Sequence, residues 1–238
     1  MRKKLLALVL ALALLPVVSL RAGAVSMQDF SGGALSGIAE SGGGLLVTVT
    51  CWAGKPGTAD LSGEPAGAYV DGSAEDARFM EPWAIAPYLN GYAVTDTEAN
   101  VVRFTDGKTV RTAAGSGKSG SADGTGAAVS FARPTGLAAG ADGELYIADT
   151  DNGLIRRLDK QGRVTTWARG LDEPTGLCWA DGALYVAETG RSRVCKIVNG
   201  RVTTLNPGSV RDSDGTYPGG YVDGPVEKAL FEHPQGVA

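Results

Sequence analysis

The sequence is poor in the side chains from which many catalytic sites are built. It contains one histidine, His233, and three widely spaced cysteines, Cys51, Cys178 and Cys195. One histidine cannot form a histidine-built zinc centre, and the serines, mostly in glycine-rich loops, have no histidine nearby to act as a base. A sparse, odd number of cysteines also differs from the dense framework of a small disulfide-bonded domain. We therefore expect the cysteines to be small buried apolar residues.

Long apolar runs are absent except at the start of the chain. Residues 2–4 are basic, residues 5–20 are almost entirely apolar, and residues 22–24 have the small-x-small pattern that signal peptidase requires. We expect residues 1–24 to be a cleaved signal peptide, leaving residues 25–238 secreted or extracytoplasmic. A retained membrane anchor is the alternative, disfavoured because polar and proline residues interrupt a run that is short for a span of about 20 residues.

Positive charge is also scarce once the signal is removed. Cleavage removes four basic residues and no acid, so 18 Lys and Arg remain against 26 Asp and Glu, a net charge of −8. Nucleic acids and anionic membranes repel such a protein. We therefore expect no nucleic-acid partner and no membrane association after cleavage.

A motif of Asp-Gly, Phe and Pro occurs three times, in residues 69–82, 121–134 and 221–234. Each copy places the Phe eight residues and the Pro eleven residues after the Asp, whereas the acids Glu75 and Asp76 of the first copy do not recur. We therefore interpret the motif as a boundary between structural units and not as an acidic site. The Asp-Gly pair is predicted to form a turn, the Phe to anchor the loop, and the Pro to start a strand.

The residues after Pro82, Pro134 and Pro174 repeat as well. An acid follows each Pro after 14 or 15 residues, and a Val follows that acid after another 14 or 15. In the unit starting at Pro134, short apolar runs separated by turn pairs predict four strands, at about 136–139, 145–149, 154–158 and 163–168. No convincing helical periodicity occurs after residue 24. Four-stranded units of roughly 35 residues bury both faces when they stack around an axis, which predicts an all-β fold, a β-propeller of four-stranded antiparallel blades.

The repeated run of Asp-Gly, Phe, Pro-x-Gly-Leu, Leu-Tyr-x-Ala-Asp, Ile-Arg and Val-Thr-Thr resembles the NHL repeat of six-bladed propellers. The resemblance covers about residues 37–238 and implies an NHL-type propeller over residues 25–238. It gives about four units and the start of a fifth, at residues 36–54, 82–115, 134–168, 174–205 and 234–238.

Two departures from the repeat suggest an incomplete ring. The unit at 36–54 lacks the counterpart of residues 149–163, so we expect a shortened, irregular first blade. The sequence also stops inside the first strand of a fifth unit. Either the chain belongs to a longer six-bladed protein, or two chains complete one ring.

The resemblance implies three kinds of function, which need different residues. They are non-catalytic binding of protein or carbohydrate, metal-assisted cleavage as in peptidyl-amidating lyases, and lactone hydrolysis as in gluconolactonases. The predicted inner strands carry no carboxylate or amide, at residues 83–86, 136–139, 176–179 and 236–238. An enzyme of either kind would therefore need ligands from blades absent from this chain.

The acids that end the second strand of each unit, Asp96, Asp149 and Glu188, are the weak metal candidates. Carboxylates on one face of a propeller could bind calcium. The alternative is that each acid accepts hydrogen bonds within its own turn, which its recurrence in every unit favours. We predict no catalytic residue and no required cofactor, with calcium as the alternative.

Recognition is predicted on the face with the long loops, residues 55–81, 116–133 and 206–233, because long loops on a rigid scaffold commonly bind ligands. The residue after each Pro varies and should lie at the mouth of the channel on that face; packing within the loops is the alternative. The sequence predicts a secreted binding module for a protein, peptide or carbohydrate, and an enzyme is the second hypothesis. The predicted ligand contacts are Trp83, Thr135, Thr175 and Gln235.

Overall fold

The computed structural model describes residues 52–54, 58–59, 65–66, 69–207 and 219–238. Within these residues the regular structure is β-strand with two short 3₁₀ turns, so the all-β prediction is confirmed. No helix in the described part of the chain is long and apolar enough to cross a membrane. The predicted signal peptide, and the shortened first unit apart from residues 52–54, lie outside the described residues.

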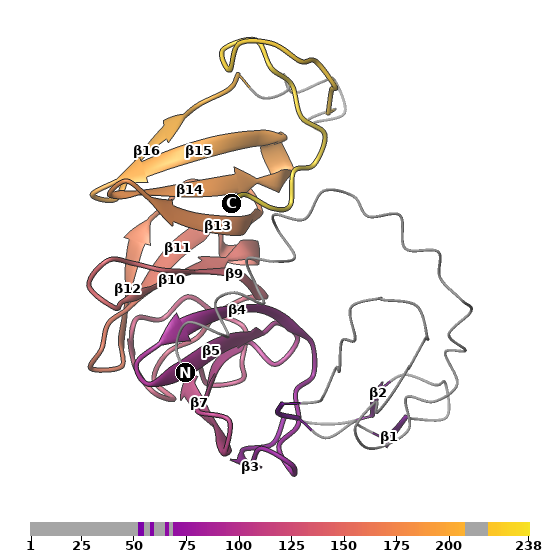
Figure 1. Ribbon diagram of the computed structural model, residues 1–238, viewed down its shortest axis with the longest axis vertical. Coiled ribbons are helices and arrows are strands. Elements are labelled where there is room, and N and C mark those ends of the chain that lie inside the picture. The colour runs from indigo at the N-terminus through magenta and orange to yellow at the C-terminus, as the bar shows by residue number, and fades with distance from the viewer. Residues whose placement is uncertain (1–51, 55–57, 60–64, 67–68, 208–218) are drawn as a thin grey trace, which may run out of the picture. The chain divides into compact units, whose positions relative to one another are not determined.

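Three antiparallel sheets form successive blades, each with its strands in chain order (Figure 1). The first blade comprises β4 (Pro82–Tyr88), β5 (Gly91–Asp96), β6 (Val101–Thr105) and β7 (Thr109–Ala114). The second comprises β9 (Pro134–Ala139), β10 (Leu145–Asp149), β11 (Leu154–Leu158) and β12 (Arg163–Ala168). The third comprises β13 (Pro174–Ala180), β14 (Ala183–Glu188), β15 (Arg193–Val198) and β16 (Arg201–Thr204).

Short elements connect or flank these blades. The 3₁₀ turns η2 (Thr150–Asn152) and η3 (Thr189–Arg191) follow β10 and β14. A separate two-stranded sheet pairs β1 (Thr58–Ala59) with β2 (Pro65–Ala66). In the second blade, β10, β11 and β12 have the predicted bounds, and β9 starts two residues earlier because Pro134 already pairs with Asp149.

Two of the three Asp-Gly segments form short strands where a turn was predicted. The strands β3 (Gly72–Ser73) and β8 (Gly124–Thr125) pair antiparallel with β7 and β12, the outer strands of the first two blades. The turn prediction was wrong because these backbones find partners along an exposed sheet edge, which sequence turn propensity does not register. The first two blades thus have five strands, and the third has four among the described residues.

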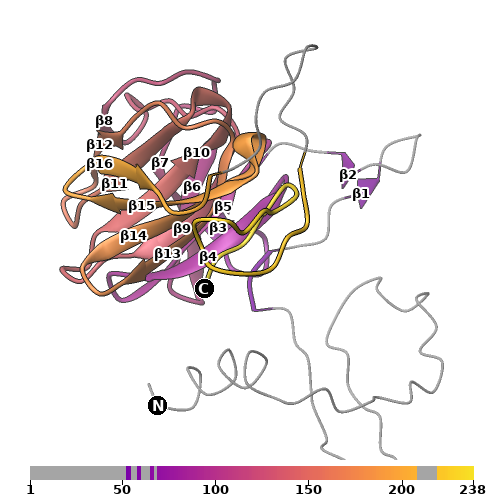
Figure 2. The same ribbon diagram turned by 90° about the horizontal axis from the view of Figure 1, so that it is seen from above.

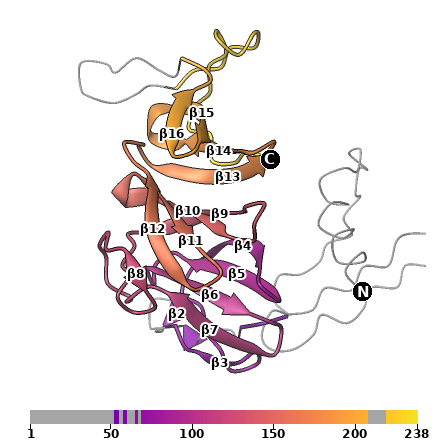
Figure 3. The same ribbon diagram turned by 90° about the vertical axis from the view of Figure 1, so that its left-hand side faces the viewer.

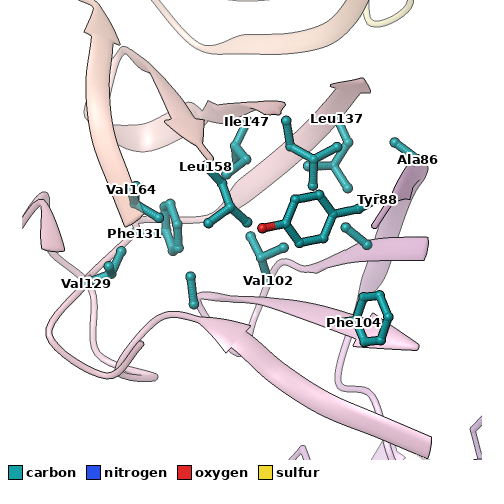
Figure 4. Packing of buried hydrophobic residues seen from close by; sticks show 13 residues of the cluster. Ala86, Tyr88, Val102, Phe104, Val129, Phe131, Leu137, Ile147, Leu158 and Val164 are labelled. Atoms are coloured by element: carbon teal, nitrogen blue, oxygen red, sulfur yellow. The ribbon is translucent and has the colours of Figure 1, made fainter. Parts of the chain in front are cut away.

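The hydrophobic core lies between the blades, as a radial stack requires. Figure 4 shows the cluster between the first two blades, where Tyr88 and Val102 meet Leu137 and Leu158, with Phe131 beside them. A second cluster joins the next pair of blades, and there the ring of Tyr146 stacks on that of Trp179 at 5.0 Å. The second blade therefore buries both faces, the first and third blades each bury one face against it, and this burial is the main stabilising term.

Figures 2 and 3 show how the blades are stacked. The inner strands β4, β9 and β13 lie at one edge of the stack, and β4 and β13 both contact β9. Seen from the side in Figure 3, the three sheets lie one above another, and they do not close into a ring within the described part of the chain. Leu137 and Leu177 are only 8% exposed because a preceding blade covers them, whereas Ile85, at the same position of the first blade, is 59% exposed.

Candidate functional site

The loop that leads into the first blade is held by a buried arginine from the third strand of that blade. The guanidinium of Arg103, on β6, donates from Nη2 to Asp71 Oδ1 at 2.7 Å and to the Val70 carbonyl at 2.9 Å. Its Nη1 donates to the Arg78 carbonyl at 2.9 Å and to Asp96 Oδ2 at 3.2 Å. One side chain therefore joins both ends of the loop to the acid that ends β5.

The second blade repeats this arrangement. Arg156, on β11, donates from Nη2 to Asp123 Oδ1 and to the Ala122 carbonyl, both at 2.8 Å. Its Nη1 donates to Asp149 Oδ2 at 2.7 Å and to the Ser130 carbonyl at 3.0 Å. Charge-assisted bonds of this geometry are among the stronger hydrogen bonds in proteins. In the first two copies of the motif the Asp of the Asp-Gly pair thus binds a buried arginine, which accounts for its spacing from the rest of the motif in these copies.

The phenylalanine of the motif packs on the same guanidinium. The Arg156 Cζ atom lies 5.3 Å from the centre of the Phe131 ring, and the Arg103 Cζ atom lies 5.1 Å from that of Phe79. Phe131 is fully buried. A cation facing an aromatic ring is favoured most where water is excluded. In these two copies the Phe therefore anchors its loop, as the sequence predicts, and it does so through the arginine, whereas Phe231 of the third copy is exposed.

The third blade has a cysteine in place of the arginine. The seven-residue interval that separates the turn acid from the arginine in the first two blades separates Glu188 from Cys195 here. Cys195 Sγ donates to Glu188 Oε2 at 3.0 Å, and Arg193 Nε donates to the same oxygen at 2.5 Å. The loop into this blade, residues 169–173, is short and has no Asp-Gly pair. In the three described blades, the arginine and the long loop therefore occur together.

Burial shifts the pKa of several of these groups. Burial, followed by the neighbouring Glu188 carboxylate, raises the pKa of the Cys195 thiol to about 12. Burial also raises the pKa of Asp149, although hydrogen bonds from Ala132, Asn152 and Arg156 oppose this. Cys195 is therefore a neutral thiol at physiological pH and not an activated nucleophile.

The three metal candidates, Asp96, Asp149 and Glu188, are buried and act as backbone acceptors. Each carboxylate accepts a hydrogen bond from one or two amides of the loop that leads into its own blade. The amide donors, at 2.7–2.9 Å, are Met80 and Glu81 for the first acid, Ala132 for the second and Asp172 for the third. Among the described residues, no three His, Cys, Asp or Glu side chains lie close enough together to hold a metal ion. The geometry gives these acids a structural role.

The threonine after each turn acid joins its blade to the next. Its hydroxyl donates to the carbonyl of the proline that starts the following inner strand, at 2.7–2.9 Å. The pairs are Thr97 with Pro134, Thr150 with Pro174, and Thr189 with Pro234. Three successive boundaries therefore share one hydrogen bond, which links the turn of each blade to the next inner strand.

Thr135 and Thr175, two of the predicted ligand contacts, belong to this interblade network. Thr135 Oγ1 lies 2.7 Å from Thr150 Oγ1, and Thr175 Oγ1 lies 2.7 Å from Thr189 Oγ1. Both side chains are buried, with 3% and 8% of their surface exposed. Their hydroxyls already have protein partners, so their position favours blade packing.

Trp83 and Gln235, the other two predicted contacts, are exposed. Trp83 has 48% of its surface accessible and lines an open hollow of about 290 Å³. The lining is almost entirely apolar and includes Trp52, Phe79, Pro82 and Ile85. The structure therefore brings Trp83 together with two other aromatic residues, Phe79 of the long loop and Trp52 before it. Trp83 is exposed, whereas Thr135 and Thr175 are buried.

Sequence reasoning missed the arginines and the bridging threonines. Arg103 and Arg156 were visible only as part of an Ile-Arg or Val-Arg pattern, seven residues after the turn acid. Arginine on a strand is usually exposed, so nothing local in the sequence indicated burial. A signal was available in the comparison of units, because the blade without the arginine is also the blade without the Asp-Gly motif.

Residues 131–158 match the NHL repeat family. The match covers one NHL repeat, in the second blade. The match begins at the Phe of the blade-boundary motif and ends on the third strand, β11, so it contains both Asp149 and Arg156. The resemblance predicted from sequence is confirmed, and the propeller class of the fold with it.

One named relative matches part of this chain. Protein SUPPRESSOR OF QUENCHING 1, chloroplastic, from Arabidopsis thaliana is 32% identical over 46% of this chain. The alignment spans 12% of that relative's length, so the chain covers a small part of it.

Two solved structures illustrate the range of propellers with a similar fold. Virginiamycin B lyase from Staphylococcus aureus is 18% identical, with a TM-score of 0.43 over 66% of this chain and 50% of the other. An auxiliary nutrient binding protein from Bacteroides ovatus is 17% identical, with a TM-score of 0.47 over 66% and 44%. The first is described as a lyase and the second as a binding protein.

Proposed function

We propose that this protein is a secreted, non-catalytic binding module that recognises a protein, peptide or carbohydrate through the face bearing the long loops. The observation that carries the proposal is the open apolar hollow beside β4, in which Trp83 is nearly half exposed. Exposed tryptophans on rigid strands are frequent anchors of binding sites, because they bury large areas at little entropic cost. We place Trp83 at the centre of the contact.

The hydrogen bonds that the three turn acids already accept support a non-catalytic role. Asp96, Asp149 and Glu188 are each occupied by backbone amides and by at least one basic or thiol group. A catalytic or metal-binding carboxylate needs a free oxygen directed at its substrate or ion. The acids hold the loops through the same type of hydrogen bond in each blade, and the loops carry recognition.

The proposed localisation follows from the sequence of residues 1–24 and from the acidic charge of the rest of the chain. A protein with a net charge of −8 is suited to neutral or basic ligands and disfavours nucleic acid and anionic lipid. Gln235, the other exposed residue of the predicted set, is assigned to the polar margin of the same surface.

Glycan and peptide arrays probed with the full mature chain test this proposal. Hits should be weakened about tenfold or more by Trp83→Ala, the loss expected when a central aromatic contact is removed. Leu89 is an equally exposed apolar residue at the other end of β4. Leu89→Ala is therefore the matched control and should leave binding unchanged. Hits that survive Trp83→Ala would contradict the assigned site.

The enzyme hypothesis has its own readout. Thermal unfolding is measured with calcium or zinc, with and without chelator, beside assays for lactone hydrolysis. A stabilisation that the chelator abolishes, together with turnover, would overturn the non-catalytic proposal. Unchanged unfolding and no turnover are the expected results.

A further inference from the structure

The third copy of the Asp-Gly motif, residues 221–234, has the backbone fold of the first copy, residues 69–82. Three backbone hydrogen bonds close the loop in each copy, at 2.8–3.3 Å. The amide and carbonyl pairs are Val70 with Arg78, Arg78 with Val70 and Ala77 with Ser73 in the first copy, and Val222 with Leu230, Leu230 with Val222 and Ala229 with Pro225 in the third. The two loops therefore place corresponding groups in the same way.

In the first copy, this backbone surrounds the guanidinium of Arg103. Three oxygen acceptors lie 2.7–2.9 Å from its nitrogen atoms, and two aromatic rings lie 5.1 and 5.3 Å from its Cζ atom. They are the carbonyls of Val70 and Arg78, the carboxylate of Asp71, and the rings of Phe79 and Tyr69. A planar, forked cation satisfies such a set, whereas the point charge of a lysine ammonium does not.

The third copy carries the same five groups. They are the carbonyls of Val222 and Leu230, the carboxylate of Asp223, and the rings of Phe231 and Tyr221. Tyr221 is 84% exposed, and Asp223 and Phe231 are exposed as well. Among the described residues, the Asp223 carboxylate accepts one hydrogen bond, from the Tyr221 hydroxyl at 3.4 Å, and meets no cation. This loop therefore has the fold and the groups of an arginine site, with its carboxylate and rings open to solvent.

We propose that residues 220–231 form an arginine clamp whose occupant is the arginine of a further propeller blade packed on the third blade. In the first two copies of the motif, the arginine comes from the third strand of the blade that the motif's own proline begins. Arg103 lies on β6 and Arg156 on β11. Pro234 has the position of those prolines, since its carbonyl accepts the Thr189 hydroxyl at 2.7 Å in the bond that recurs at each blade boundary. The clamp therefore stands where a blade begins.

A glycine in each inner strand leaves room for the next inner strand. A Cβ atom on Gly136 would overlap the carbonyl oxygen of Thr175, and one on Gly176 would meet that of Gln235. Gly236 has the same place in its segment, and among the described residues nothing lies within 4 Å of a Cβ atom built there. The segment after the clamp thus keeps the small residue that admits a neighbouring inner strand.

A second copy of the three described blades does not supply this arginine. Arg103 and Arg156 are fully buried against the loops of their own blades. Withdrawal of either would leave two aspartates without their cation, which is strongly unfavourable. The occupant is therefore an arginine of a blade other than these three. The hollow beside Trp83 is lined by residues between 52 and 105, so the clamp is a separate site and does not depend on the proposed function.

An NMR titration of the isotope-labelled full chain tests the clamp. The probe is the acetylated, amidated peptide Asn-Val-Val-Arg-Phe-Thr-Asp, the sequence of residues 100–106, which carries the arginine that the first copy binds. Amide signals of residues 222–230 should shift with a dissociation constant of about 1 mM or tighter. Those of residues 122–130 should not shift, because Arg156 already binds their loop. The same peptide with uncharged citrulline in place of arginine should bind about tenfold more weakly.

Two variants distinguish the clamp from a general attraction of the peptide to an acidic loop. Asp223→Asn removes the clamp's carboxylate and should weaken binding about tenfold or more. Glu227 is an exposed acid of the same loop, so Glu227→Gln is the matched control and should leave binding unchanged. Unchanged melting temperatures verify that both variants are folded.

Four results would overturn the proposal. They are no shift at millimolar peptide, equal binding of the citrulline peptide, equal binding by Asp223→Asn, and binding that appears only in Arg211→Gln. The last result would make Arg211, which lies outside the described residues, the occupant of the clamp.

Discussion

Arg103 and Arg156 explain, at the scale of single residues, why an acidic loop motif recurs in a protein without a described acidic site. Each is fully buried and holds a pair of aspartates, one from the loop and one from the end of a strand. A buried ion pair adds little net stability over an apolar pair, but loss of one partner leaves an uncompensated charge. The arginines therefore specify where the loops lie.

Replacement of Arg156 by Met should be strongly destabilising. The change leaves Asp149 and Asp123 without their cation and the Ser130 carbonyl without its donor, and the Ala122 carbonyl keeps only the Ser130 amide. We expect a loss of about 3–5 kcal/mol in the free energy of unfolding, measured by urea denaturation. The matched control is Arg157→Met, on the neighbouring exposed position, which should change stability by about 0.5 kcal/mol or less. Equal effects of the two variants would refute the role of the buried position.

The thiol of Cys195 should be unreactive in the folded protein. Its pKa of about 12 keeps it protonated, and its side chain is fully buried. Iodoacetamide at pH 8 is therefore expected to label Cys178, which is partly exposed, and to label Cys195 only after unfolding. Mass spectrometry of peptides from the native protein provides the measurement, and fast native labelling of Cys195 would contradict the structure.

At the scale of elements, the blades are joined by their cores and by one repeated threonine bond. The hydroxyls of Thr97, Thr150 and Thr189 each reach the carbonyl of the next blade's first proline. Because that carbonyl lies at the start of the inner strand, the bond sets where the strand begins relative to the preceding turn. This makes the acid-threonine pair a signature of a blade boundary.

Thr150→Val should weaken the boundary between the second and third blades. The substitution keeps the shape and leaves the Pro174 carbonyl without this donor, which costs about 1–3 kcal/mol in the free energy of unfolding. Thr203→Val, on the exposed outer strand β16, is the control and should have little effect. Equal stability of Thr150→Val and the wild-type chain in denaturant melts would show that the bond is dispensable.

Much of the strand order could be predicted from the sequence because it depends on local alternation and turn pairs. The bounds of β10, β11 and β12 followed directly from the unit at 134–168. The contacts of Arg103 and Arg156 could not be predicted. Each arginine bonds an aspartate more than 30 residues away in the sequence, and the presence of an arginine does not indicate which acid it will pair with. The covering strands β3 and β8 were missed for the same reason. Only the comparison of one blade with another makes them visible.

At the scale of the whole molecule, the described residues include three propeller blades that share two hydrophobic cores. The exposure of Ile85 against the burial of Leu137 and Leu177 shows what a neighbouring blade contributes at each boundary. Stability in such a stack depends on nearest neighbours, so the terminal blades should open at lower free energy than the second blade.

The proposed export of the protein gives a prediction for the chain that starts at residue 1. When the chain is expressed in a bacterium, the mature form should begin at residue 25, because residues 22–24 form the predicted cleavage site. Intact-mass analysis of the periplasmic fraction checks this. A product retained in the membrane with residue 1 intact would instead support the alternative, an uncleaved anchor.

Hydrogen exchange in the wild-type chain and in Arg156→Met tests most directly whether a buried arginine holds each long loop to its own blade. The hydrogen-bonded amides of the loop into the second blade, those of Gly120, Ser130 and Ala132, should be protected from exchange in the wild-type chain, because they bond to Phe131, to Ala122 and to Asp149. In the variant, this loop should lose protection while β14 and β15 keep theirs. Loop protection that is unchanged by the substitution would contradict the account.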